Sequence, residues 1–378
     1  MIACGGSGAL KVLVLGAGLA GTLLALELAE GGAQVELAGG PMVSGASGCS
    51  YGGVPWWAGA DDAFGRLLAA APARWSALQD RYGDLGLSSS QLWLHWSAAD
   101  DPAAVAAARS ALATLPQRPA QHAFSAAELW RAEPLLAGAD LAGAVQLPYL
   151  QVDPARLQQG VEQALARLGV ERSAAVDAAA LPQRLEQVDA AVVCAGAFSG
   201  SMLQQLGLTP PGQLRFSWAG VLQLERPELS SPIIAMPLLG ARRQRELTAG
   251  GPPLVLDPGL APGPAGGLLV GQTSWFDQGL EHPPEPQAEE QRLMAVARQL
   301  LPHEAVAAMG RISLHQRAVA YSTDQLPLLG PLQDCSAIHM FTGFSGAFAQ
   351  VPVLAPLLAG AMLRGEWSEL SDLGVLCR

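Results

Sequence analysis

The pattern of apolar and polar positions predicts a strand, a turn and a helix near the start of the chain. Residues 10–15 form a short apolar run, the segment after Gly21 has helical composition, and residues 34–38 form a second strand pattern. Gly16, Gly18 and Gly21 therefore fall at a strand-to-helix turn, which is typical of a doubly wound sheet. In such a turn the first glycine permits the bend, the second lets a pyrophosphate approach the backbone, and the third lets the helix pack on the strand.

Similar pieces recur in the middle and at the end of the chain. Asp153 and Pro154 are an N-cap and first-turn pair, and the predicted helix ends at Gly169, with Leu157, Val161, Leu165 and Leu168 on one face. Residues 188–194 form an apolar run that leads into "AGAFSG", as in a buried parallel strand.

The end of the chain repeats the order of strand, glycine turn and helix. Residues 337–341 predict a strand, "TGFSGAFAQ" a turn, and residues 351–363 a closing helix. Between these pieces, Ser125 and Glu128 form a capping box, and residues 249–267 are rich in glycine and proline and predict a loop.

Composition and charge exclude several classes of function. The 378 residues are 50% hydrophobic and 15% charged, which predicts a globular chain of two or three domains. A net charge of -11 argues against nucleic-acid binding, and we expect the short basic run of Arg242, Arg243 and Arg245 to be a solvated loop. Lys11 is the only lysine, so Schiff-base chemistry is excluded beyond that one position.

The cysteines, the histidines and the apolar stretches set further limits. Five cysteines without a CxxC pair favour a reduced cytoplasmic setting over a disulfide framework, and the six histidines show no metal-ligand spacing. We expect neither a signal peptide at residues 12–26 nor a membrane span at residues 335–363, because glycines interrupt the first and glycines and prolines the second.

Eight short segments together resemble the D-amino-acid oxidase-like flavoprotein family, and they occur in the family's order over nearly the whole chain. They are "VLVLGAGLAG", "SGASGCSYGG" at 44–53, "AEPLL" at 132–136, "VDPARL" at 152–157, "DAAVVCAGAFS" at 189–199, "LLVGQTSWFDQG" at 268–279, "STDQLPLLGP" at 322–331 and "TGFSG" at 342–346.

The resemblance implies an α/β fold with FAD held by a discontinuous Rossmann-like domain, and a second, β-sheet-based α+β domain for the substrate. It places the FAD-binding domain at residues 1–85, 150–212 and 310–378, and the substrate domain at residues 86–149 and 213–309. Three small-residue loops, the first at 16–21, the second at 47–53 and the third at 343–348, suit a cofactor as extended as FAD better than one glycine turn does. In the family the third loop lies beside the flavin N1 and C2 oxygen, where negative charge gathers on reduction.

Mapped onto this sequence, the resemblance assigns cofactor binding to residues in all three loops and to residues 176, 195 and 196. These are Gly16, Ala17, Gly18, Leu19, Ala20, Gly21, Ser47, Ser50, Gly52, Gly53, Val176, Ala195, Gly196, Gly343, Ser345, Gly346, Ala347 and Phe348.

The residues expected at the substrate depart from the family pattern. In many relatives an arginine five residues before the aspartate of "DQLP" binds the substrate carboxylate, and here that position is Val319. Arg317, two residues earlier on the same strand face, is the nearest arginine, and we expect it to face the substrate cavity. One relative has at that position the cysteine that links FAD covalently, so FAD is expected to bind noncovalently here.

Other positions complete the expected catalytic set. Gln350 replaces a lysine and Gly346 an arginine of relatives, so the carboxylate clamp is altered. The catalytic candidates are Arg317, Tyr321, Tyr51 and Gln350. Tyr51, Trp56 and Trp57 could wall the flavin or fill the core.

The acidic partner of the adenosine ribose is also altered. A count of twenty residues from Gly16 nominates Glu36, whereas alignment with the family places the acid at Gly39, on the opposite strand face. We therefore expect Glu36 to point away from the ribose.

The sequence thus predicts an FAD-dependent oxidoreductase that oxidises the C–N bond of a small amine or amino acid by hydride transfer to flavin N5. Oxygen or a quinone would reoxidise the flavin. Two alternatives stay open: a flavin-binding protein that has lost catalysis, and a nicotinamide-dependent dehydrogenase that uses only the first glycine turn.

Overall fold

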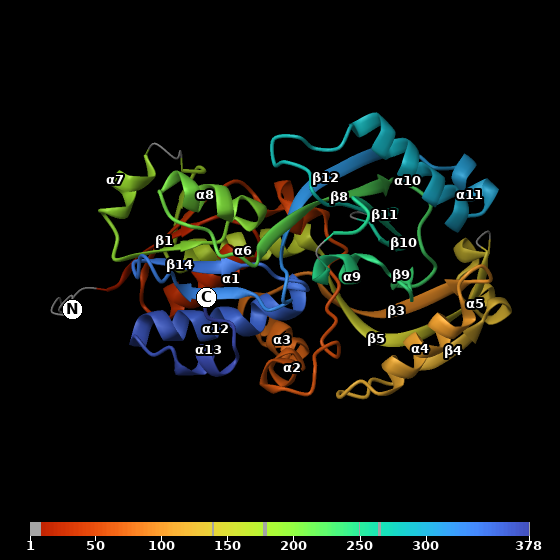
Figure 1. Cartoon of the computed structure of the whole chain (residues 1–378), viewed down its shortest axis with the longest axis horizontal. Helices are drawn as coiled ribbons and strands as arrows, with labels where there is room; N and C mark the ends of the chain where they lie inside the picture. Colours follow the sequence, from red (N-terminus) through yellow and green to blue (C-terminus); the bar gives the residue numbers. More distant parts are fainter. Residues whose placement is uncertain (1–8, 138–139, 177–179, 249, 264–265, 378) are drawn as a thin grey trace.

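The computed structural model describes residues 9–137, 140–176, 180–248, 250–263 and 266–377. Two β-sheets lie side by side along the long axis, each with helices packed against it (Figure 1). The strands are β1 (Lys11–Leu15), β2 (Gln34–Ala38), β3 (Leu87–Ser97), β4 (His122–Ser125), β5 (Leu141–Val152), β6 (Glu171–Ser173), β7 (Ala190–Val193), β8 (Leu214–Leu224), β9 (Ile233–Pro237), β10 (Leu254–Pro262), β11 (Leu268–Trp275), β12 (Ile312–Ser322), β13 (Leu328–Pro331) and β14 (Ile338–Thr342).

The helices connect these strands and cover the sheets. The α-helices are α1 (Leu19–Glu30), α2 (Ala63–Leu68), α3 (Ala71–Tyr82), α4 (Pro102–Ala113), α5 (Ala126–Ala132), α6 (Pro154–Arg167), α7 (Leu181–Leu185), α8 (Ser199–Gln205), α9 (Arg242–Leu247), α10 (Pro286–Leu300), α11 (His303–Ala307), α12 (Ala347–Arg364) and α13 (Ser368–Asp372). Four short 3-10 turns are η1 (Met42–Ser44), η2 (Ala46–Cys49), η3 (Pro134–Leu136) and η4 (Gly196–Phe198).

The first sheet has the strand order β13-β14-β7-β1-β2-β6 and is parallel apart from the edge strand β13. Alternate residues of β1 face opposite layers: Val12 and Val14 pack with α1, α6 and α12, whereas Leu13 and Leu15 pack with α7 and α8. Burial on both faces explains why β1 and β7 are continuous apolar runs. Because β1, β7 and β14 are parallel, their carboxyl ends meet at one edge of the sheet.

The second sheet has the order β12-β8-β11-β10-β9-β3-β5-β4, and only the β3–β9 pairing is parallel. One face packs on α10 through residues such as Leu222, Val270 and Leu293. The opposite face carries Val221 and Ile234. The division into two domains stays a prediction. Its boundaries do not follow the sheets at β12, which the division assigns to the FAD-binding domain but which is a strand of the second sheet.

Several local predictions are confirmed. The Asp153 carboxylate accepts hydrogen bonds from the N–H groups of Ala155 and Arg156 at the start of α6, and both halves of the Ser125–Glu128 capping box form. The prediction of a loop at 249–267 was wrong in part, because residues 254–262 form β10. The ladder of β10 with β11 is irregular between Leu256 and Gly259, and an irregular ladder of this kind accommodates Pro258 within a strand.

The closing helix α12 differs from the expected residues 351–363. It begins at Ala347, and it contains both Pro352 and Pro356. By length and composition it is apolar enough to cross a membrane, but 61% of the 18-residue helix is buried inside the molecule. It is the core helix that packs along α1 beside the first sheet (Figure 1).

Candidate flavin and substrate site

A cavity of about 470 Å³ lies where the carboxyl edge of the first sheet meets the second sheet. Its lining comes from the three small-residue loops on one side and from strands of the second sheet on the other. This edge is where doubly wound sheets bind their ligands.

The first glycine loop has the geometry that the sequence predicts. Gly16 has a φ of +116°, and a Cβ there would lie 2.5 Å from the carbonyl oxygen of Cys194. A Cβ on Gly21 would lie 1.8 Å from the oxygen of Gly16, so only glycine permits this approach of helix to turn. A Cβ on Gly18 would meet only Ser47 Oγ, at 3.4 Å, so among the described residues little covers the N-terminus of α1.

The second loop, which contains η1 and η2, is joined to the first by a hydrogen bond. Ser47 Oγ accepts from the N–H of Leu19 at 3.1 Å, which brings this hydroxyl to the N-terminus of α1. Ser50 Oγ instead accepts from the N–H of Gly52 within the loop. Gly52 has a φ of +68° and a would-be Cβ 1.9 Å from the oxygen of Val152, so it is a packing glycine.

The third loop joins β14 to α12. Gly343 has a φ of +80°, and Gly346 occupies the N-cap of α12 without a side-chain cap. The N–H groups of Ala349 and Gln350 are bonded to the oxygen of Gly346. The uncapped first turn lies in the cavity wall, where its remaining N–H groups can bind an acceptor.

The second sheet supplies a mainly apolar wall with a few polar groups. Ala219, Val221, Ile234 and Met236 are apolar parts of it, and Tyr149, Gln272, His315 and Arg317 contribute polar atoms. Tyr51, from the second loop, packs beside this wall and also lines the cavity. Burial raises the pKa of the Tyr51 phenol, and the nearby Asp257 charge raises it further, so the hydroxyl stays protonated. Within the described residues, this buried hydroxyl has no hydrogen-bond partner. It is therefore available to a ligand as a donor.

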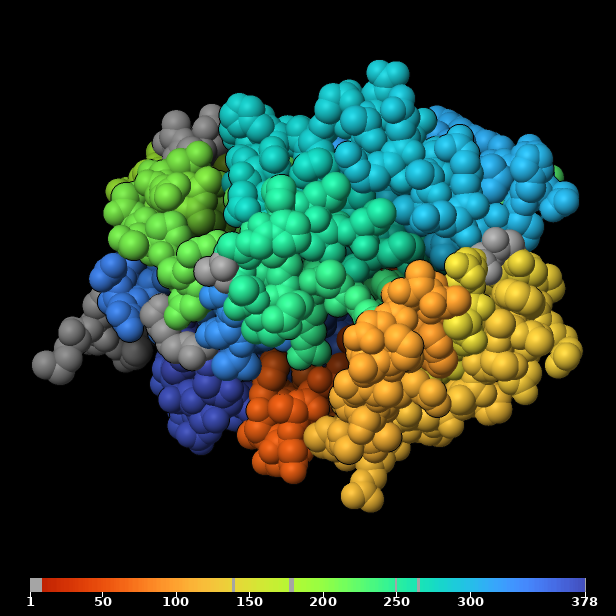
Figure 2. Space-filling model, turned by 45° about the vertical axis from the view of Figure 1, so that its right-hand side comes forward, coloured from red at the N-terminus to blue at the C-terminus, as the bar shows by residue number. Residues whose placement is uncertain are grey.

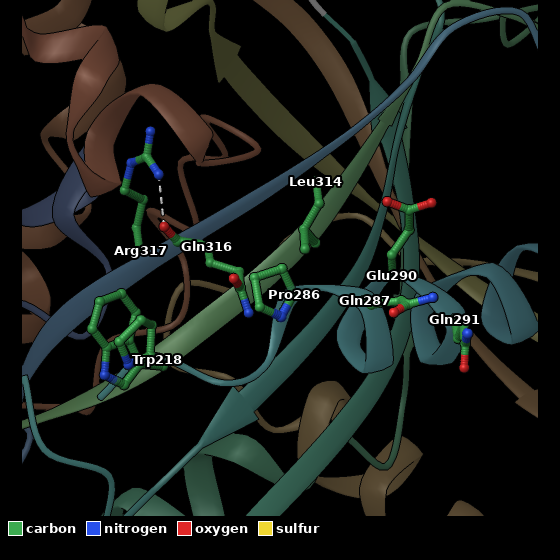
Figure 3. Close-up of a pocket in the computed structure, with 9 residues that line it drawn as sticks. Trp218, Pro286, Gln287, Glu290, Gln291, Leu314, Gln316 and Arg317 are labelled. Atoms are coloured by element: carbon green, nitrogen blue, oxygen red, sulfur yellow. Dashed lines mark hydrogen bonds between the residues drawn. The ribbon is translucent and has the colours of Figure 1, made fainter. Parts of the chain in front are cut away.

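Arg317 bridges β12 and the second loop. Its Nε donates to the oxygen of Ser44 at 2.8 Å and its Nη1 to the oxygen of Gln316 at 2.7 Å. Figure 3 shows its guanidinium on the side of β12 opposite to the side chain of Gln316, which points toward Pro286 and an open groove beside α10. Arg317 thus lines the cavity, as expected, and a part of its donor capacity holds the loop that carries Ser47.

Most of the residues assigned from the resemblance lie together in this cavity. Its lining contains Gly16, Gly18, Leu19, Ala20, Ser47, Ser50, Tyr51, Gly53, Ala195, Gly196, Arg317, Gly343, Ser345, Gly346, Ala347 and Phe348. Outside it lie Ala17, Gly21, Gly52, Val176, Tyr321 and Gln350.

Two expected catalytic residues are outside the cavity because they belong to other packing layers. Tyr321 is 5% exposed and packs against Val255 and Phe276, with 6.0 Å between the Tyr321 and Phe276 ring centroids. Gln350 is buried on α12, and neither side chain lines the cavity. Trp57 is a core residue whose Nε1 donates to the oxygen of Pro148 at 2.8 Å.

Glu36, which we expect to point away from the ribose, is bound by residues of β6 and α7. Its carboxylate accepts from Ser173 Oγ and pairs with Arg184. Burial acts to raise the pKa of this carboxyl, but the hydrogen bonds from Arg184 and Ser173 outweigh it and hold the pKa below its usual value. Gly39 has a φ of +150°, and a Cβ there would lie 2.7 Å from the N atom of Ala17, so this position does not readily accept an acid.

The basic run at 242–245 is not the solvated loop that composition predicted. It forms α9, in which Arg245 is 8% exposed, pairs with Asp277 at 2.8 Å and lies over the Phe276 ring.

Arg242 lines the cavity. Sequence reasoning missed Arg242 because it reaches the cavity from a separate helix. It could have found His315, which shares a strand face with Arg317 through the period of two.

The comparisons with known proteins agree with this geometry. The sequence model of the family described as FAD dependent oxidoreductase matches residues 11–361. No curated protein matches the sequence.

Solved structures share the whole fold at low sequence identity. Glycine oxidase from Geobacillus kaustophilus is 19% identical with a TM-score of 0.70, and the match covers 95% of this chain and 96% of that one. Iminodiacetate oxidase from Chelativorans sp. BNC1 is 19% identical with a TM-score of 0.68, covering 94% and 95%. L-α-glycerophosphate oxidase from Mycoplasma pneumoniae, solved with FAD bound, is 13% identical with a TM-score of 0.66, covering 94% and 95%.

The chain belongs to the family of FAD dependent oxidoreductases, because the family model matches it over nearly its whole length. It is an enzyme of the D-amino-acid oxidase type, and FAD is its cofactor. This assignment favours FAD over the nicotinamide cofactor that one glycine turn alone would allow.

Proposed function

We propose that this enzyme oxidises the C–N bond of a small amine or amino acid. The observation that carries the proposal is the single cavity that joins three flavin-type loops to the apolar face of the second sheet. When bound, FAD supplies the hydride acceptor, its N5 atom. The chain then has to hold the substrate carbon in place and exclude water.

The residues of the cavity divide this work. The N-terminus of α1 and Ser47 would hold the pyrophosphate, and the uncapped start of α12 would stabilise negative charge at the edge of the flavin that faces it. Val221, Ile234 and Met236 would exclude water, and the protonated Tyr51 hydroxyl would donate a hydrogen bond to the substrate.

The setting and attachment of the cofactor are part of the proposal. Cys49, Cys194 and Cys335 are free thiols, which suits a reducing cytoplasmic compartment. FAD is expected to bind noncovalently, with oxygen or a quinone as the acceptor. Acid precipitation should release all the flavin. Flavin retained on the denatured chain would contradict this, and Cys49→Ala would then test the one cysteine side chain of the second loop that lines the cavity.

An anaerobic panel tests the reaction class. The holoprotein is mixed with primary amines, N-methyl amines, α-amino acids and, as a C–O comparator, glycerol phosphate, and bleaching of the flavin is followed. We expect at least one amine or amino acid to bleach it and glycerol phosphate to leave it oxidised. Bleaching by dithionite but by no amine would support a flavin-binding protein without turnover. Bleaching by glycerol phosphate alone would move the activity to C–O oxidation.

A further inference from the structure

Arg242 reaches the cavity from α9, a helix that the strand patterns do not predict. In Figure 1, α9 lies where the two halves of the molecule meet, near β9 and β10. In the space-filling view, the green segment that contains α9 covers the middle of the face shown (Figure 2). The Arg242 side chain is 25% exposed and lines the cavity together with Met236 and Gln272.

The position of Arg242 is fixed by two carboxylates. Asp257 on β10 accepts from the N–H groups of Ala241 and Arg242 at 2.9 and 3.1 Å, which ties the first turn of α9 to the sheet. Glu246, whose side chain is 5% exposed, accepts from Arg242 Nε at 2.9 Å. The far end of the helix is held by the ion pair of Arg245 with Asp277.

These contacts leave the outer part of the guanidinium available. Of the three guanidinium nitrogens of Arg242, only Nε donates a hydrogen bond to another described residue, so both Nη groups can bind a ligand. Such a fork matches the two oxygens of a carboxylate. Arg317 is less available, because its Nε and Nη1 are already bonded to the carbonyl oxygens of Ser44 and Gln316.

The charges around the cavity favour an anion on the substrate. Arg242 and Arg317 are the only charged residues in the described lining, which contains no aspartate or glutamate. Glu246 and Asp257 contact Arg242 but do not line the cavity. Val319 on β12 occupies the position where many relatives have their carboxylate-binding arginine. It lines the cavity, but its apolar side chain cannot bind an anion.

We infer that Arg242 binds the carboxylate of the substrate, which is therefore an amine that also carries an acid group. This inference rests on the proposed function. It places the acid group toward the β9–β10 side of the cavity instead of against β12. Glu246 is a positioning residue, which orients the guanidinium through Nε.

The test measures binding without turnover. Short monocarboxylates of about two to six carbons, which have no amine to oxidise, are titrated into the holoprotein, and the visible absorption of the bound flavin is followed. Removal of Arg242 would strand the buried Glu246 charge, so Arg242→Met is made together with Glu246→Gln and compared with Glu246→Gln alone. We expect carboxylate affinity to fall by about 10- to 100-fold, which corresponds to the loss of a charged hydrogen bond.

Two further variants make the result specific. Arg243 lies on the same helix but is exposed, and within the described part of the chain its side chain bonds to Gln325 through Nε, so Arg243→Met should leave carboxylate affinity within about twofold. Arg242→Lys keeps the charge but loses the fork, so its affinity should fall to an intermediate value. It also provides a milder variant if the double variant fails to retain FAD.

Three results would overturn the inference: no carboxylate perturbs the wild-type flavin, the affinity survives in both Arg242 variants, or Arg243→Met weakens binding as much as they do. Failure of the proposed function looks different. In that case carboxylates bind through Arg242, but no amine bleaches the flavin.

Discussion

Two consecutive glycines at the end of β2 differ in what they can accept. Gly39 has a φ of +150°, and its would-be Cβ meets the backbone N of Ala17 at 2.7 Å, whereas a Cβ on Gly40 would meet only Ser44 Oγ, at 3.6 Å. The turn therefore explains why the acid of the family is absent at position 39. Only glycine adopts this φ easily and leaves room for the backbone N of Ala17.

A matched pair of variants tests this conclusion. Gly39→Ala should lower the free energy of unfolding by about 1–3 kcal/mol, because it combines a strained φ with a backbone contact. Gly40→Ala should change it by about 0.5 kcal/mol or less. Chemical denaturation gives both values, and equal costs would contradict the assigned geometry. Gly39→Glu should weaken FAD binding in a titration of the apoprotein; tighter binding would restore the simple alignment argument.

Individual residues of the site differ in how far the sequence alone could predict them. The first glycine turn was predictable because Gly21 acts on a residue close in sequence: a Cβ on Gly21 would lie 1.8 Å from the oxygen of Gly16. Arg242 was not predictable, because its contact with the cavity depends on Asp257 and on how α9 packs against β10. Tyr321 was assigned to the site by resemblance, but it lies in an apolar layer with Phe276.

At the scale of elements, α3 compensates for the two prolines inside α12. Pro352 has no N–H, so the carbonyl of Phe348 loses its helical partner; Trp75 Nε1 donates to that oxygen at 2.7 Å. Pro356 likewise frees the carbonyl of Pro352, which accepts from Arg74 Nε at 3.2 Å. Because Phe348 lines the cavity, this pairing also holds the start of α12 in the cavity wall.

A double-mutant cycle measures this compensation. Trp75→Phe leaves the buried Phe348 carbonyl without a partner and should cost about 1–3 kcal/mol beyond the lost packing. Pro352→Ala restores an N–H to that carbonyl, so Trp75→Phe should cost about 1 kcal/mol less in the Pro352→Ala background. Chemical denaturation of the four proteins gives the coupling energy. A coupling near zero would show that the Trp75 hydrogen bond does not replace the missing helical one.

At the scale of the whole molecule, two buried histidines make stability depend on pH. Burial lowers the pKa of His95 and of His339 to about 4, one in each sheet. The unfolded chain binds these protons near pH 6.5, so their contribution is complete above that pH and is lost as the pH falls toward 4.

Denaturation at a series of pH values tests this linkage. The wild-type free energy of unfolding should fall by on the order of 2–3 kcal/mol per histidine between pH 7 and pH 4. The variant with both His95→Gln and His339→Gln should show a flatter profile. Parallel profiles for the two proteins would show that carboxyl groups alone cause the acid sensitivity.

For the whole molecule, we propose that FAD and an amine meet in the cavity between the two sheets. Hydride then leaves the carbon that bears nitrogen. The most direct measurement mixes the holoprotein anaerobically with its best amine, unlabelled and deuterated at that carbon. We predict bleaching of the flavin, about one carbonyl product per flavin after hydrolysis, and slower bleaching with deuterium. Bleaching without a carbonyl product, or no bleaching by any amine in a protein that holds FAD, would contradict the account.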